Sequence, residues 1–213
     1  MLDEVVTGMG RTGTWFASDA LPLVPDIVTT AKGLGAGYGP VGAVLCGQHV
    51  YDAFAAGSRA FEHGHTWDGA PLSCAVGLAV IDHLRRHALV ERVHEHGPRL
   101  RDAIADALAD CELVREVRGR GFLLGVEYVD PRDGESFLDP DLRVARRIDE
   151  AALERGLLLY STQPTRDGYA GDQTLLAPAF VTPEAEQDLI VERLADTVHA
   201  VAREVQDALV AAR

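Results

Sequence analysis

The residue in this sequence best placed for covalent chemistry is a lysine at the end of a β-branched run. Lys32 follows Ile27–Thr30 by two residues and is succeeded by glycines at positions 33, 35, 37 and 39. β-Branched residues favour a pleated strand and the glycines end it, so Lys32 is predicted to lie where a strand becomes a loop. Its neighbours are small or apolar, and desolvation favours the neutral amine that attacks a carbonyl to form a Schiff base. A glycine-rich turn whose lysine reaches water is the alternative, and this stretch alone does not decide between them.

The start of the chain supplies two adjacent carboxylates on a second predicted strand. Asp3 and Glu4 lie in a short apolar stretch that continues through Val5 and Val6. Because side chains alternate along a strand, the two carboxylates are predicted to face opposite sides. Asp3 and Val5 would then share one face, where both can touch one flat ligand.

Asp3 and Lys32 lie in two of three sequence segments that follow one another along the chain and together form a recognisable set of motifs. They are D-E-V-V-T-G-M-G-R-T-G from Asp3, P-D-I-V-T-T-A-K-G-L-G from Pro25, and H-G-H-T-W-D-G-A-P-L-S-C-A from His63. Together they resemble the class III (subgroup II, fold-type I) pyridoxal-phosphate-dependent aminotransferases. V-R-G-R-G-F-L-L-G-V-E from Val117 and L-L-A-P-A-F-V-T-P-E from Leu175 extend the resemblance over nearly the whole sequence.

The resemblance implies an α/β fold that corresponds to the C-terminal half of such an enzyme. Residues 1–97 would form the C-terminal part of the large mixed-sheet domain, which binds pyridoxal 5′-phosphate. Residues 98–213 would form the small α+β C-terminal domain. In the family a comparable length of chain precedes the first motif and carries the main phosphate-binding loop.

The resemblance also gives each candidate residue a role. Lys32 matches the lysine that forms the internal aldimine with pyridoxal phosphate and then moves the proton between the substrate carbon and the cofactor carbon. Asp3 matches the carboxylate that pairs with the pyridine nitrogen, where an anion keeps the nitrogen protonated and the ring an electron sink. Val5 matches the aliphatic residue on one face of the ring. Thr66, together with His65, matches the site that hydrogen-bonds the cofactor phosphate of the neighbouring subunit in a homodimer.

The implied reaction is amino transfer between an amine or amino-acid donor and a keto or aldehyde acceptor. An aminomutase or racemase on the same scaffold is one alternative, since these enzymes share the lysine and the aspartate. A non-catalytic fragment that needs its N-terminal half is another. For Thr66, the alternative to phosphate binding is a helix N-cap, because an apolar helix follows it closely.

The substrate side departs from the family at one position. Many members that act on amino acids carry a carboxylate-binding arginine just before the A-P-P segment, and Leu175 stands there in this sequence. An apolar side chain cannot form that charge-assisted pair. Arg166, in the preceding loop, is a substitute cation, and an exposed loop arginine without that role is the alternative.

Composition narrows the function classes. The 213 residues contain 20 Lys+Arg against 33 Asp+Glu, a net charge of −13 that disfavours nucleic acids and anionic membranes as partners. No apolar run is long enough to span a bilayer and the N-terminus lacks a signal-peptide pattern, so the protein is predicted to be cytoplasmic. Neither the three cysteines nor the histidines show the spacing of a disulfide framework or a metal site.

The remaining elements are predicted from periodicity and turn residues. A helix from Pro71 would bury Ala75, Leu78, Ala79 and Leu84, and Pro98 would kink or break its continuation. Further predicted elements are strands over Val41–Leu45, Phe122–Tyr128, Leu157–Tyr160 and Leu175–Phe180, a helix from Asp139 and Pro140, and a last helix after Thr182 and Pro183.

Overall fold

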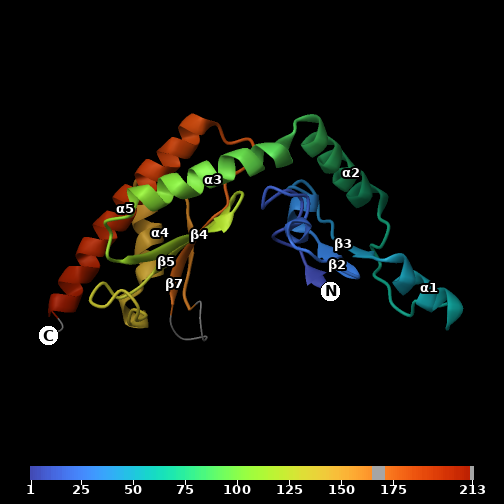
Figure 1. Ribbon diagram of the computed structural model, residues 1–213, viewed down its shortest axis with the longest axis horizontal. Helices are drawn as coiled ribbons and strands as arrows, with labels where there is room; N and C mark the ends of the chain where they lie inside the picture. The colour runs from blue at the N-terminus through green and yellow to red at the C-terminus, as the bar shows by residue number, and fades with distance from the viewer. Residues whose placement is uncertain (165–170, 212–213) are drawn as a thin grey trace. The chain divides into compact units, whose positions relative to one another are not determined.

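The computed structural model describes residues 1–164 and 171–211 (Figure 1). The chain divides into two compact units, Met1–His94 and Glu95–Arg213. Each unit combines a β-sheet with α-helices, which confirms the α/β fold class predicted from the sequence. The domain boundary predicted after residue 97 stays a proposal.

The first unit contains a mixed sheet of three strands in the order β1–β2–β3. The strands are β1 (Leu2–Asp3), β2 (Ile27–Thr30) and β3 (Ala43–Cys46). The central strand β2 pairs in parallel with β1 and antiparallel with β3. The strand predicted over Ile27–Thr30 is confirmed, and β3 begins two residues later than predicted.

Two helices follow this sheet, α1 (Gln48–Ala56) and α2 (Pro71–Arg86). Proline begins α2, at a position whose backbone N–H has no partner within a helix in any case. The apolar face predicted for this helix is largely wrong, because Ala75, Leu78 and Ala79 are exposed while Gly77 and Leu84 are buried. A narrow side of α2 is therefore covered within its own unit.

A left-handed residue separates α2 from α3 (Leu89–Ala107). Ala88 has a φ of 48°, which an α-helix cannot accommodate, so the helical run is interrupted there. Pro98, which was predicted to kink or break the helix, does not break it, since Pro98 lies inside α3. Packing explains why the helix continues, because Leu100 and Ile104 beyond the proline are each only 1% exposed.

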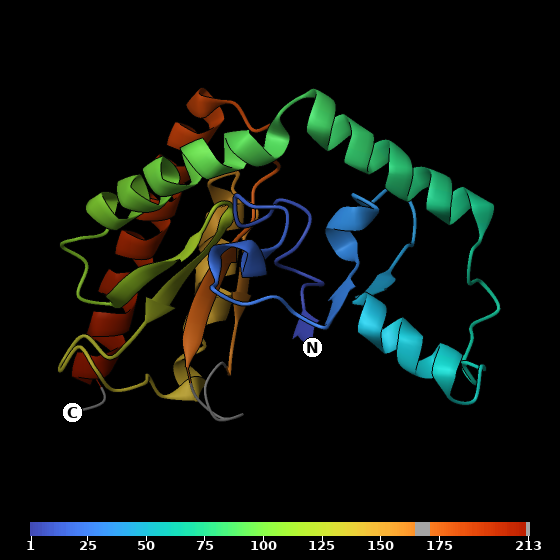
Figure 2. The same cartoon turned by 45° about the vertical axis from the view of Figure 1, so that its right-hand side comes forward.

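The second unit is built on an antiparallel sheet of four strands in the order β4–β5–β7–β6. The strands are β4 (Val114–Arg120), β5 (Leu123–Tyr128), β6 (Tyr160–Thr162) and β7 (Asp172–Leu176). The helices α4 (Val144–Glu154) and α5 (Glu184–Ala211) lie along one side of this sheet in Figures 1 and 2. Leu124, Val126 and Tyr128, alternate residues of β5, are at most 1% exposed, so the core lies on one face of the sheet.

Three predicted boundaries in the second unit are wrong, and one strand was not predicted. The strand predicted over Leu157–Tyr160 is β6, which begins only at Tyr160 and ends at Thr162. The strand predicted over Leu175–Phe180 is β7, which ends at Leu176 because prolines cannot donate to the strand ladder and Pro178 follows. Asp139 caps a short 3₁₀ turn, and α4 starts only after Arg143, whose φ of 51° separates the two. The polar, glycine-containing strand β4 was not predicted at all.

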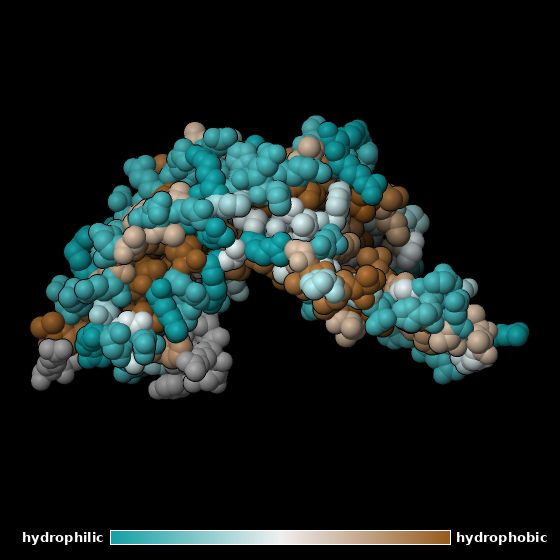
Figure 3. All heavy atoms as spheres, in the orientation of Figure 1, coloured by the Kyte–Doolittle hydropathy of each residue, from teal (hydrophilic) through white to brown (hydrophobic). Residues whose placement is uncertain are grey.

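The surface of the first unit carries many apolar side chains. Val44 is 69% exposed, Trp67 81% and Leu72 79%. Figure 3 shows apolar residues gathered at the surface over β2 and β3 and along α2. Exposed apolar surface of this extent is typical of an interaction site. Across residues 1–164 and 171–211, no helix has both the length and the hydropathy needed to cross a membrane.

Candidate active site

Two parallel strands bring the candidate carboxylate and the candidate amine to one edge of the first sheet. Asp3, the last residue of β1, lies beside Thr29 of β2, and the backbone N–H of Glu4 donates to the Thr29 carbonyl oxygen at 2.8 Å. Because the carboxyl ends of parallel strands meet at the same edge, Asp3 lies at the edge from which the chain continues to Lys32. Open α/β sheets commonly bind their ligands at this edge.

Lys32 begins a single 3₁₀ turn, Lys32–Leu34, immediately beyond β2. Its φ of 32° is positive, which is uncommon for a residue other than glycine. The Leu34 N–H donates to the Ala31 carbonyl at 2.7 Å, and the Gly35 N–H donates to the Lys32 carbonyl at 3.0 Å. Such backbone conformations persist only where the surroundings fix them, and they are concentrated at functional sites.

Close packing fixes the loop that carries the lysine. Leu34 is 8% exposed and packs on α2, where a Cβ added to Gly77 would lie 3.7 Å from the Leu34 side chain. A Cβ added to Gly35 would lie only 2.2 Å from the Gly39 carbonyl oxygen. The glycines after Lys32 therefore allow the loop to fold closely on itself.

Lys32 is more exposed to solvent than the sequence predicts. The Lys32 side chain is exposed, and so are Gly33, Ala36 and Gly37, whose side chains are too small to cover an amine. Within the described part of the chain, no hydrogen bond or ion pair engages the amine. Lys32 is also the only lysine among the 213 residues. The amine is therefore accessible to a ligand.

Asp3 is exposed and is held at only one of its two carboxylate oxygens. Oδ1 accepts a hydrogen bond from the Val5 backbone N–H at 2.9 Å and a long one from the Thr29 hydroxyl at 3.5 Å. Oδ2 has no partner among residues 1–164 and 171–211. A carboxylate with one fixed and one free oxygen is suited to accept a hydrogen bond from a charged N–H group of a ligand.

Val5 lies outside β1, in the turn that follows it, and is half-buried. The prediction that Val5 lies in the same strand as Asp3, and therefore on the same face, is wrong. The strand ends at Asp3 because the hydrogen bond between its carboxylate and the Val5 N–H turns the chain. Contact between Val5 and a cofactor ring stays a proposal.

Glu4 is a buried carboxylate whose role the sequence did not reveal. It is 3% exposed, whereas Asp3 is exposed, as strand alternation predicts for neighbours. Glu4 accepts hydrogen bonds from the N–H groups of Ala17 at 3.0 Å and Ser18 at 2.8 Å and from the Thr7 hydroxyl at 2.5 Å. Burial raises the pKa of Glu4, but these hydrogen bonds outweigh burial and hold the pKa below its usual value. Alternation predicts that Asp3 and Glu4 face opposite sides but not which of them is buried, and the partners in the Ala17–Ser18 turn lie too far along the chain to be inferred.

His65 and Thr66 lie in the exposed segment between α1 and α2. The His65 backbone N–H donates to the Asp68 carboxylate at 2.8 Å, and the Nε2 atoms of His63 and His65 are 3.2 Å apart. The helix-cap alternative for Thr66 is wrong, since Ala70 is the N-cap of α2. Among the described residues, no hydrogen bond or ion pair joins this segment to Asp3 or Lys32, and no group of three or more His, Cys, Asp or Glu side chains is arranged to hold a metal ion.

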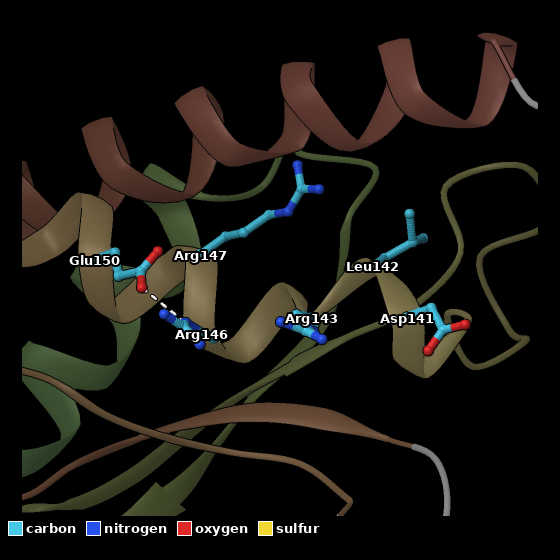
Figure 4. Close-up of a pocket in the computed structure, with 6 residues that line it drawn as sticks. All are labelled: Asp141, Leu142, Arg143, Arg146, Arg147 and Glu150. Carbon is cyan, nitrogen blue, oxygen red and sulfur yellow. Dashed lines mark hydrogen bonds and ion pairs between the residues drawn. The ribbon is translucent and has the colours of Figure 1, made fainter.

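The second unit contains a surface hollow of about 370 Å³ beside the start of α4. In Figure 4, Arg146 points to Glu150 while Arg147 points away from it toward α5. These two arginines are paired, Arg146 with Glu150 at 2.7 Å and Arg147 with Glu204 at 3.7 Å. None of the candidate residues lines this hollow, which is formed by Asp141, Leu142, Arg143, Arg146, Arg147 and Glu150.

Leu175 lies half-buried in β7, between Gly125 of β5 and Tyr160 of β6. Neither neighbour is a cation that could replace the arginine absent at this position. Arg166, the substitute cation considered from the sequence, lies outside the described residues.

The cation closest in register to Leu175 is Arg118, which pairs with Gly125 on the other side of that strand. Its guanidinium forms ion pairs with Glu116 and Glu127 and a long hydrogen bond of 3.5 Å to Gln173. The hydrogen bond to Glu127 is the main reason that the pKa of Arg118 is raised. Arg118 is therefore already neutralised by two carboxylates of its own sheet.

The structure is that of an α/β protein with its only lysine at the end of a sheet strand. The profile of the class-III aminotransferases matches residues 1–198, and the chain belongs to this family. An uncharacterized aminotransferase of Bacillus subtilis is 32% identical over 204 residues, which cover 96% of this chain and 46% of that protein. Acetylornithine aminotransferase 1 of Bordetella pertussis is 47% identical over 131 residues, 62% of this chain and 32% of that protein.

Solved structures show the same likeness. A transaminase obtained by ancestral reconstruction matches with a TM-score of 0.88 and 35% identity, over 95% of this chain and 44% of that one. A PLP-bound amine transaminase from an uncultivated Pseudomonas species matches with a TM-score of 0.83 and 32% identity, over 93% of this chain and 44% of that one. The fold is therefore that of part of a fold-type I enzyme, and the chain spans less than half the length of these relatives.

Proposed function

We propose that this chain serves a transaminase that moves an amino group from an amine or amino-acid donor to a keto or aldehyde acceptor, using pyridoxal 5′-phosphate held on Lys32. The observation that carries the proposal is the parallel pairing of β1 with β2. This pairing places a carboxylate with one free oxygen and the chain's only lysine at the same edge of one sheet.

The residues at this edge fit the cofactor. The free Oδ2 of Asp3 can accept a hydrogen bond from a protonated pyridine nitrogen, and the unpartnered amine of Lys32 can react with an aldehyde. When bound, pyridoxal phosphate supplies that aldehyde and a ring that withdraws electrons from the substrate carbon.

Lys32 acts twice in this scheme. Its amine would hold the cofactor through the cofactor's aldehyde group, and the same amine, once released by the substrate amine, would move a proton from the substrate carbon to the cofactor carbon. Asp3 keeps a proton on the ring nitrogen, which makes removal of the substrate proton easier. Val5 packs against one ring face.

His65 and Thr66 act on a second copy of the chain. Both are exposed on a segment that makes no hydrogen bond to the Asp3–Lys32 edge among the described residues. We propose that they hydrogen-bond the cofactor phosphate of the neighbouring subunit in a homodimer. The exposed apolar surface of the first unit supports an interaction with further polypeptide.

The donor is proposed to be an amine or amino acid whose carboxylate is not bound at position 175. Leu175 offers no charge there, and Arg118, two strands away, is engaged by Glu116 and Glu127. Among the described residues in register with Leu175 across the sheet, no free cation is available to bind a substrate carboxylate.

Covalent labelling tests the central assignment. The 213-residue chain is incubated with pyridoxal phosphate, reduced with borohydride, digested and analysed by mass spectrometry. Lys32 is the only lysine, so the other primary amine is the Met1 α-amino group. The reduced cofactor should be found on the Lys32 peptide, and Lys32→Arg, which keeps the charge, should abolish it. Labelling found only at Met1 would contradict the proposal.

A further inference from the structure

The turn that follows β1 is fixed by Glu4 through both its backbone and its side chain. The Glu4 N–H donates to the Thr29 carbonyl at 2.8 Å, and the Glu4 carbonyl accepts from the Gly8 N–H at 3.0 Å. Its carboxylate binds the N–H groups of Ala17 and Ser18 at 3.0 and 2.8 Å. Glu4 therefore attaches the Ala17–Ser18 turn to the end of β1.

Gly8 shows how closely this turn is packed. A Cβ added there would lie 2.8 Å from the Glu4 carbonyl oxygen and 3.2 Å from the Phe16 ring. The peptide that joins Glu4 to Val5 is thus held on both sides. Its N–H, which belongs to Val5, is the group that donates to Asp3 Oδ1 at 2.9 Å.

We infer that Glu4 and Thr29 are positioning residues for Asp3. Glu4 fixes the peptide whose N–H holds Oδ1 from the turn side, and the Thr29 hydroxyl approaches the same oxygen from β2 at 3.5 Å. Both leave Oδ2 as the oxygen presented to a ligand. The inference rests on the proposed function, in which Oδ2 accepts from the ring nitrogen of the cofactor.

Two carboxylates adjacent in sequence thereby take different tasks. Asp3 is exposed and would touch the cofactor, whereas Glu4 is 3% exposed and acts through the Val5 peptide. Thr29 belongs to β2, which leads to Lys32, and its hydroxyl approaches Asp3 of β1. The Thr29 side chain therefore influences the position of Asp3 relative to Lys32.

The first test needs no cofactor. An amide that donates to a carboxylate changes its NMR chemical shift when that carboxylate is protonated, so the Val5 amide reports its bond to Asp3. In the wild-type chain the Val5 amide should titrate with Asp3. Glu4→Gln and Thr29→Val should each reduce that titration amplitude by about half, and Thr29→Ser, which keeps the hydroxyl, should restore it.

A matched control separates positioning from general loosening of the turn. Asp19→Asn alters a carboxylate that accepts from the Phe16 N–H at 2.9 Å in the same segment without contacting β1. It should leave the Val5 titration unchanged. If Glu4→Gln and Thr29→Val give the same Val5 titration as Asp19→Asn, the inference is wrong. Thr29→Val is isosteric and suits a strand, so it provides a folded variant even if Glu4→Gln unfolds.

The second test connects positioning to the ring nitrogen. Binding of pyridoxal phosphate is compared with binding of an analogue in which carbon replaces the ring nitrogen. Glu4→Gln and Thr29→Val should weaken pyridoxal phosphate binding by about three- to tenfold, the size of one typical hydrogen bond, and leave the analogue unaffected. Equal weakening of both ligands would show a merely structural role and overturn the inference.

The two failures are distinguishable. Absence of cofactor labelling at Lys32 in the wild-type chain counts against the proposed function alone. An unchanged Val5 amide in the variants counts against the positioning of Asp3, whatever the cofactor does. In the Asp3→Asn background, Glu4→Gln should cause no further loss of cofactor affinity, because the group it positions has been removed.

Discussion

Replacing two glycines in the lysine loop one at a time should separate displacement of Lys32 from simple loss of stability. Gly35 has φ −99° and ψ −9°, which alanine adopts freely, but its Cβ would lie 2.2 Å from the Gly39 carbonyl oxygen. The Cβ position is fixed by the backbone of residue 35 and the Gly39 carbonyl is itself backbone, so the loop must open until the contact reaches at least about 3.0 Å. Overpacking of this kind costs about 1–3 kcal/mol.

Gly37 is the matched control, because alanine is unfavourable there for its backbone conformation and not for a steric clash. Its φ is 80° and a Cβ there would meet nothing within 4 Å. Alanine in that left-handed conformation costs about 1–2 kcal/mol, comparable to the cost at Gly35, without pushing any neighbour. The two variants should therefore unfold at similar temperatures and differ in the position of Lys32.

The assay is the rate at which borohydride fixes pyridoxal phosphate on the Lys32 peptide, with thermal unfolding measured alongside. A misplacement approaching 1 Å costs roughly 100-fold in a reaction that depends on orientation. Gly35→Ala should slow labelling by a factor on the order of 10 to 100, and Gly37→Ala by less than about threefold. If both variants label at the same rate, the packing of the loop does not position the amine.

Four further substitutions give expected outcomes. Asp3→Asn should keep Lys32 labelling but slow proton transfer from an amine donor by about 100-fold, as followed by cofactor absorbance, because the ring nitrogen loses its anionic partner. Thr30→Val should raise the free energy of unfolding by about 1 kcal/mol in a denaturant titration, since the buried Thr30 hydroxyl has no partner among the described residues; a loss of stability would contradict this and show that the hydroxyl is hydrogen-bonded. Burial raises the pKa of Asp172, so folding favours its protonated form and its contribution to stability falls as pH rises through that raised pKa. Asp172→Asn should therefore raise the unfolding temperature at neutral pH but not at pH 3, and a gain of equal size at both would contradict this. Leu175→Arg should shift a donor panel toward amino acids with a second carboxylate, and an unchanged panel would remove position 175 from the substrate site.

The sequence predicts best where local chemistry and strand period agree. Ile27–Thr30 is a strand from end to end because its β-branched residues fit a pleated surface and glycines follow. The same stretch placed Lys32 at a strand end, which the structure confirms. Long helices were also found, since Pro183 and the periodic apolar residues after it mark the start of α5.

The sequence fails where distant contacts decide the outcome. Pro98 is compatible with α3 only because the helix beyond it is packed through Leu100 and Ile104, which no local rule reveals. Strand alternation at the N-terminus failed for Val5 because a hydrogen bond from its own N–H to Asp3 ended the strand. The hydrogen-bond partners of Glu4 cannot be predicted from the sequence either, since their position depends on how the chain returns to β1.

The two ends of the proposed cofactor site are supported to different degrees within this chain. Asp3 and Lys32 are held by strand pairing, by the Glu4 hydrogen bonds and by a loop in which alanine does not fit at position 35. His65 and Thr66 follow α1, a helix without a single buried residue, on an exposed segment. A helix gains most of its stability from packing an apolar face, so α1 needs a surface that its own unit does not provide. If Thr66 binds a phosphate on a neighbouring subunit, docking of that subunit would supply such a surface. In the proposed function, the amine and the carboxylate are therefore held within one chain, whereas binding of the cofactor phosphate depends on a second copy.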